Sequence, residues 1–242
     1  MRSIHDNLQA VRQRIARAAA AASRDPAGVT LLAVSKTHPA ELLRQAIAAG
    51  QRAFGENYVQ EALEKMEALA GDPAANSIEW HLIGPLQSNK TCQVAERFDW
   101  VHTVQSEKIA RRLSSQRPAG RPALNVLIQV NVSGEASKSG VVPQEVAGLA
   151  RAMAALPNLR LRGLMAVPEP TSDTALQRAR FRQLREILPA VPAPDTLSMG
   201  MSDDMEAAIA EGATMVRVGT AIFGARRRGG GTELPPLQKS AA

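Results

Sequence analysis

This chain of 242 residues has little cysteine, lysine or aromatic side chain, and each shortage excludes a class of protein. The single cysteine, Cys92, excludes a disulfide within the chain and is typical of a reducing cytoplasm. No apolar run approaches the roughly 18 residues that a membrane-spanning helix needs. The segment Met1–Asp6 lacks the apolar core of a secretory signal. We therefore predict a cytoplasmic protein with no membrane association.

The basic charge raises the question of nucleic-acid binding. The formal net charge is +6, but six of the 29 basic residues are lysine and the rest are arginine. The arginines are spread along segments with helical patterning, such as Arg12, Arg14 and Arg17. Aromatic residues make up 3 % of the chain, so platforms on which bases would stack are scarce. We predict a solvated basic surface and no dedicated nucleic-acid site.

Short apolar runs alternate with amphipathic segments along the whole chain. This alternation predicts parallel strands joined by helical crossovers. At a length near the ~250 residues typical of the fold, one (β/α)8 TIM barrel is favoured, with a doubly wound open sheet as the alternative. We predict a barrel over 1–225 that includes an N-terminal helix, and a disordered tail over 226–242. The predicted strands are 29–35, 52–54, 79–83, 99–103, 124–131, 161–166, 196–199 and 215–218.

Lys36 stands between an apolar run and a turn. The run Val29–Val34 is mostly Val and Leu and follows Asp25-Pro26-Ala27-Gly28, which is the pattern of a buried strand. Pro39 is then expected in the first turn of a helix. A lysine at such a strand end can be partly desolvated, which lowers its pKa and makes the neutral amine a nucleophile toward an aldehyde. A surface lysine is the alternative that this stretch leaves open.

Two loops have the composition of a phosphate site. After strand seven, Gly200 and Met201 lead to Ser202, which we expect at a helix start. After strand eight, Gly219 and Thr220 offer backbone N–H groups and a hydroxyl at another expected helix start. Barrels commonly bind phosphate between the loops that follow strands seven and eight. The pair of loops therefore predicts an anion site, although each motif alone would also suit a turn or a helix cap.

Arg217 is expected to point into the barrel. Period-two alternation places Val216 and Val218 on one face of the strand and Arg217 on the other. A buried arginine needs a partner. The sequence leaves two possibilities open: a structural ion pair with Glu56 or another acid, and a hydrogen bond to a ring nitrogen of a bound ligand.

Other polar positions give weaker signals. Asn57 follows strand two and is predicted to cap the next helix. His38, His81 and His102 lie near different strands without paired spacing, so we predict no metal site. The chain also lacks a Gly-x-Ser-x-Gly nucleophile elbow, a glycine-rich dinucleotide fingerprint and a Walker lysine.

Several motifs together resemble the pyridoxal phosphate homeostasis proteins. They occur in order between about residue 4 and Gly224. The resemblance implies a single barrel like the N-terminal domain of alanine racemase, which is the type III fold of enzymes that use pyridoxal 5'-phosphate (PLP). The motifs are Ala33-Val34-Ser35-Lys36, Phe54-Gly55-Glu56-Asn57-Tyr58, Trp80-His81-Leu82-Ile83-Gly84-Pro85-Leu86-Gln87-Ser88-Asn89-Lys90, Ser137-Lys138-Ser139-Gly140, Leu197-Ser198-Met199-Gly200-Met201-Ser202 and Val216-Arg217-Val218-Gly219-Thr220.

The resemblance also implies a role for each matching residue. Lys36 would bind the cofactor covalently as a Schiff base. The phosphate would be held by Ser202, Gly219 and Thr220, with help from the Met201 backbone. Arg217 would face the pyridine nitrogen, and Asn57 would lie near the ring. Lys138 would lie on the entrance loop.

By the same resemblance, we expect a PLP carrier that is not an enzyme. An arginine at the pyridine nitrogen keeps that nitrogen unprotonated and makes the ring a poorer electron sink. Alanine racemase compensates with two opposed bases, one of them a tyrosine from outside its own barrel, whereas this chain has one tyrosine, Tyr58. We expect a monomer that delivers PLP to apo forms of PLP-dependent enzymes. A PLP-dependent racemase or decarboxylase, and a phosphosugar enzyme that uses Lys36 without a cofactor, are the alternatives.

Overall fold

Eight parallel strands form a closed barrel. The computed structural model describes residues 3–135 and 138–225. The strands lie side by side in chain order, and β1 pairs with both β2 and β8, which closes the sheet. The predicted barrel is therefore confirmed. The strands are β1 (Thr30–Val34), β2 (Ala53–Glu56), β3 (Glu79–Leu82), β4 (Trp100–Val104), β5 (Leu124–Gln129), β6 (Leu159–Met165), β7 (Thr196–Ser198) and β8 (Met215–Val218).

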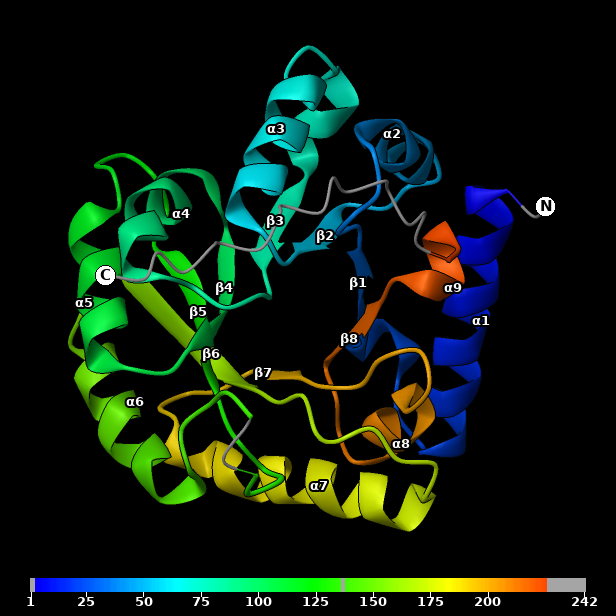
Figure 1. Cartoon of the computed structure of the whole chain (residues 1–242). Coiled ribbons are helices and arrows are strands. Elements are labelled where there is room, and N and C mark those ends of the chain that lie inside the picture. Colours follow the sequence, from blue (N-terminus) through cyan, green and yellow to red (C-terminus); the bar gives the residue numbers. More distant parts are fainter. Residues whose placement is uncertain (1–2, 136–137, 226–242) are drawn as a thin grey trace, which may run out of the picture.

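The helices form a ring outside the barrel (Figure 1). The N-terminal helix α1 packs against α2, α8 and α9, on the side where the first and last strands meet. The predicted tail, 226–242, lies outside the described residues. Within those residues, no helix is long and apolar enough to span a membrane. The helices are α1 (Ile4–Ala21), α2 (Ala40–Ala48), α3 (Val59–Leu69), α4 (Thr91–Arg97), α5 (Glu107–Gln116), α6 (Val146–Ala154), α7 (Thr174–Ile187), α8 (Met205–Ala210) and α9 (Thr220–Phe223).

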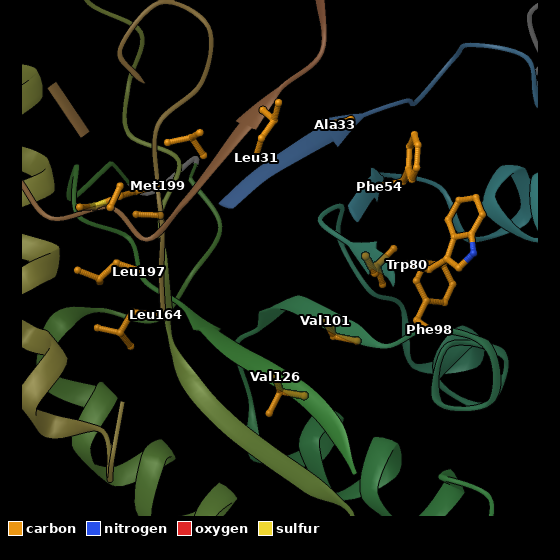
Figure 2. Packing of buried hydrophobic residues seen from close by; sticks show 14 of the residues in the cluster. Leu31, Ala33, Phe54, Trp80, Phe98, Val101, Val126, Leu164, Leu197 and Met199 are labelled. Carbon is orange, nitrogen blue, oxygen red and sulfur yellow. The ribbon is translucent and has the colours of Figure 1, made fainter. Parts of the chain in front are cut away.

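The main apolar core lies between the strands and the helices. Successive residues of a strand point to opposite faces, so alternate apolar residues reach this layer. On β1, Leu31 and Ala33 belong to it, and Trp80 of β3 packs near Phe54 of β2 with ring centroids 6.2 Å apart (Figure 2).

The interior of the barrel is filled by side chains from the other face of the strands. One small apolar cluster there contains Leu32 and Met215, which alternate with outward-facing neighbours. A second contains Trp100, Leu127 and Met165. Two buried histidines accompany these clusters, and their contacts are described below.

Two predicted helix starts are displaced in the structure, and a third differs only in the place of its proline. Helix α2 begins at Ala40, so Pro39 is its N-cap and not a residue of its first turn. Asn57 is not the N-cap of α3, because the helix begins at Val59 and Tyr58 is its N-cap. The Asn57 backbone lies close to Gly84. Ser202 precedes α8 by a turn, because the Asp204 carboxylate accepts the Met201 amide there and Asp204 becomes the N-cap.

Candidate functional site

A cavity of about 570 Å³ opens at the carboxyl ends of β1, β7 and β8. Six of the seven predicted site residues line it, although Lys36 is more than 150 residues from the other five in the chain. Active sites of such barrels are built at this end, from the loops that follow the strands. The six are Lys36, Met201, Ser202, Arg217, Gly219 and Thr220.

Lys36 lies just beyond β1, on a short segment whose backbone is held by side chains of α3. The Lys65 ammonium of α3 is 6 % exposed and contacts the Ser35 carbonyl at 2.7 Å and the Glu61 carboxylate at 2.6 Å. Glu61 in turn accepts the Thr37 amide at 2.5 Å. Thr37 has a φ of 65°, which is uncommon for a β-branched residue. Contacts on both sides of Lys36 therefore fix the backbone from which its side chain enters the cavity.

The loop after β7 is shaped by Gly200. Its φ is 91°, and a Cβ at this position would lie 2.5 Å from Cβ of Ala208. This turn directs Met201 and Ser202 toward the cavity.

Burial raises the pKa of Asp204, while the Met201 amide and the positive charge of Arg217 oppose that shift.

The loop after β8 brings backbone close to β1. A Cβ on Gly219 would lie 3.0 Å from the Val34 carbonyl oxygen, so the absence of a side chain permits this approach. Gly219 is the N-cap of α9 and Thr220 is its first residue, as predicted. Amides in the first turn of a helix have no intrahelical acceptor. The loop therefore presents N–H groups and a hydroxyl next to Ser202.

Arg217 points into the barrel as predicted and is 4 % exposed. Its Nη1 donates to Oγ of Ser198 at 2.8 Å, and its Nη2 donates to the Ala166 carbonyl at 2.8 Å. Burial lowers the pKa of Arg217 to about 10, opposed by the charge of Asp204, so the guanidinium is charged at neutral pH. The suggested ion pair with Glu56 is wrong.

Glu56 has other partners on its own side of the barrel. Its Oε1 accepts from Lys65 at 2.7 Å and from the Ser35 hydroxyl at 2.6 Å. Burial raises the pKa of this carboxyl, and Lys65 opposes the rise. Glu56 is therefore part of the buried network, with Lys65 and Ser35, that holds the segment carrying Lys36.

Arg14 is a cavity residue that sequence reasoning missed. Its Nη2 donates to the Ser202 carbonyl at 3.0 Å and to Glu206 at 2.8 Å. The residue lies on α1, 188 positions before Ser202. No local motif marks it, since only closure of the barrel brings α1 beside α8.

Asn57 lies beside the cavity, not in its lining. It borders a neighbouring hollow of about 350 Å³ with Tyr58, Gln87 and Lys90. Its side-chain oxygen is buried and accepts no hydrogen bond within the described part of the chain. Across residues 3–135 and 138–225, no group of three His, Cys, Asp or Glu side chains has the geometry of a metal site.

Comparison with known proteins places this arrangement in a family. Residues 7–227 match the model of the alanine racemase N-terminal domain. The pyridoxal phosphate homeostasis protein of Pseudomonas aeruginosa is 62 % identical over 230 residues, covering 95 % of this chain and 98 % of the relative. The chain belongs to the pyridoxal phosphate homeostasis protein family. The Escherichia coli member is 55 % identical over 93 % of this chain.

Solved structures agree with the family assignment. PipY of Synechococcus elongatus, determined with PLP bound, is 37 % identical and covers 91 % of this chain and 100 % of its own, with a TM-score of 0.78. Alanine racemase from Corynebacterium glutamicum shares the fold, with a TM-score of 0.66 at 18 % identity. That match covers 95 % of this chain and 62 % of the racemase.

Proposed function

We propose that this protein binds PLP in the cavity at the carboxyl ends of β1, β7 and β8 and serves intracellular PLP homeostasis. The observation that carries the proposal is the convergence on one cavity of Lys36 with the loops after β7 and β8. A family member of similar length, PipY, has been solved with PLP bound. Bound PLP would supply an aldehyde that reacts reversibly with an amine.

Each cavity residue has a different role in binding PLP. Lys36 supplies the amine for the covalent bond, since it is the lysine that lines the cavity. Ser202 and Thr220 offer hydroxyls to the phosphate, and Gly219 and Met201 offer backbone. The Arg217 guanidinium would face the pyridine nitrogen of bound PLP, where its charge would disfavour protonation. Asn57 acts from the edge of the site, where it borders the neighbouring hollow and its buried side-chain oxygen has no hydrogen-bond partner among the described residues.

We propose that the protein carries PLP and does not turn over a substrate. An unprotonated pyridine nitrogen makes the PLP ring a poor electron sink, so a reaction through a carbanion would need two well-placed bases. Tyr58, the single tyrosine, is 58 % exposed and borders the neighbouring hollow, not this cavity. We further propose a cytoplasmic monomer, one barrel domain over 1–225, that passes PLP to apo enzymes.

The first experiment tests the covalent bond. The absorption spectrum of the purified protein with added PLP would be compared with those of Lys36→Ala and of Lys108→Ala, an exposed lysine on α5. We expect a visible band in the parent and in K108A, and none in K36A. Borohydride reduction and peptide mass spectrometry should then place the cofactor on Lys36. A band that survives in K36A, or no band in the parent, would refute the proposal.

A second experiment separates a carrier from a racemase. Amino acids incubated with the PLP-loaded protein in D2O should keep their α-hydrogen over many hours. Mixing the loaded protein with an apo PLP-dependent enzyme should restore the activity of that enzyme. Incorporation of α-deuterium at a rate well above that of free PLP would favour the racemase-like alternative.

A further inference from the structure

A continuous line of buried polar groups crosses the interior of the barrel. It starts at Arg217 of β8, whose Nη1 is 2.8 Å from Oγ of Ser198 at the end of β7. Nδ1 of His102 on β4 is 3.0 Å from that Oγ, and its Nε2 is 3.0 Å from Nδ1 of His81 on β3. Nε2 of His81 lies 3.7 Å from a carboxylate oxygen of Glu79, which is 60 % exposed at the start of β3, and it has no hydrogen-bond partner among the described residues. The hydrogen-bonded line therefore runs from the cavity to His81, which lies beside the start of β3.

The donors along this line can all point the same way. A guanidinium only donates, so Ser198 accepts from Arg217, and its own proton is available to His102. In this arrangement Nδ1 of His102 accepts, and the proton of its neutral ring is on Nε2. That Nε2–H donates to Nδ1 of His81, which leaves the His81 proton on Nε2, on the side of Glu79 but beyond hydrogen-bond distance of it. The line begins at a cation, so each hydrogen bond along it polarises the next.

Burial and the hydrogen bond between the two rings favour the neutral form of both histidines. Both side chains are fully buried, and the two rings share one hydrogen bond, in which only one nitrogen can donate. Burial lowers the pKa of His102 well below its usual range, and the charges of His81 and Arg217 lower it further. Burial also lowers the pKa of His81, against the opposing effect of Glu79 and Asp99.

We propose that Ser198, His102 and His81 are positioning residues for Arg217, with both histidines neutral and protonated on Nε2. Among the described residues, the guanidinium donates to the Ser198 hydroxyl and the Ala166 carbonyl, and both of these acceptors are neutral. A carboxylate in their place would neutralise the arginine. A neutral, oriented chain fixes the guanidinium and leaves its positive charge available to the cavity. The expected effect on PLP binding rests on the proposed function, whereas the assignment of the histidine tautomers does not.

Nuclear magnetic resonance of the cofactor-free protein tests the tautomers directly. With 15N-labelled histidine, the ring nitrogens of His102 and His81 should both report Nδ1 as the acceptor and Nε2 as protonated. Ser198→Ala should shift the Nδ1 resonance of His102 toward that of an unbonded nitrogen. Ser114→Ala, which removes a buried hydroxyl on α5, should leave both rings unchanged. A His102 protonated on Nδ1, or a spectrum unaffected by S198A, would overturn the inference.

Titration with PLP tests the effect on the site. S198A removes a hydrogen bond to a charged group, so we expect PLP affinity to fall about tenfold or more and the absorption band to move. His102→Asn keeps an acceptor for the Ser198 hydroxyl and should retain more affinity than His102→Phe. Unchanged affinity and band in both S198A and H102F would overturn the positioning role. If the parent itself binds no PLP, the proposed function is refuted. The NMR measurement of the histidine tautomers would still test the inference about the hydrogen-bonded line.

Discussion

Replacing Lys65 with methionine should weaken both the fold and the segment that carries Lys36. The Lys65 ammonium makes three close contacts, to the Ser35 carbonyl, Glu56 and Glu61. Glu56 is fully buried, and its second oxygen already has no partner among the described residues. Removal of one member of a buried ion pair leaves an uncompensated charge and costs about 3–5 kcal/mol. We expect Lys65→Met to lose that much free energy of unfolding at neutral pH.

The pH dependence of the loss identifies its cause. Burial raises the folded-state pKa of Glu56 above its unfolded value, and Lys65 opposes the rise. Without Lys65 that pKa rises further, so the folded state binds a proton more tightly than the unfolded state. Lowering the pH through the folded pKa then stabilises the variant relative to neutral pH. The deficit of K65M should therefore be largest above neutrality and shrink as the medium becomes acidic.

Urea unfolding followed by tryptophan fluorescence measures these quantities in the cofactor-free protein. K65M combined with Glu56→Gln removes the unpaired charge, so the double variant should recover part of the loss. Lys108→Met, at an exposed position of α5, should change stability by less than about 0.5 kcal/mol. A loss below about 1 kcal/mol for K65M, which is the size of a surface pair, would refute the reasoning. So would a deficit that is the same at acidic and alkaline pH.

Two further predictions concern the loops of the cavity. Gly200→Ala should lose about 2–4 kcal/mol in urea unfolding, because it combines a positive φ with a Cβ 2.5 Å from Ala208. Gly50→Ala, which has a φ of 83° and open space around it, should lose only about 1–2 kcal/mol, and an equal loss in the two would contradict the close contact. Arg14→Gln should lower PLP affinity several-fold, since it removes the bidentate pair with Glu206 that holds Arg14 on the Ser202 carbonyl. Its urea midpoint should stay near that of the parent because the pair is partly exposed, and unchanged affinity would exclude Arg14 from the site.

The sequence predicted the barrel because its physical signals are local. Each strand is a short apolar run bounded by turns, and eight runs alternating with helices leave few topologies. The position of Lys36 followed from one such boundary. The direction of Arg217 followed from alternation along a single strand. These inferences needed no knowledge of which strands are neighbours.

Features that depend on neighbouring strands were beyond sequence reasoning. His81 and His102 each looked isolated, because their contact requires the register that sets His81 beside Trp100 across β3 and β4. The partner of Glu56 was misjudged for a similar reason. Lys65 is on the next helix, nine residues away, and its helical position gave no sign that it would be buried.

The cavity is thus supported by two buried networks of different electrostatic kind. Beneath Lys36, charged groups hold the backbone, and the ammonium of Lys65 compensates Glu56 without facing the cavity. Beneath Arg217, neutral groups accept the hydrogen bonds of the side chain, and its charge interacts with that of Asp204 without an ion pair among the described residues. If the Lys65 network were neutral, Glu61 would lose the charged partner that holds it beside the Thr37 amide. If the Arg217 network were ionic, the positive charge that Arg217 offers to the cavity would be neutralised. The charged network should therefore govern the stability of the segment around Lys36, and the neutral one the electrostatics of the bound ring.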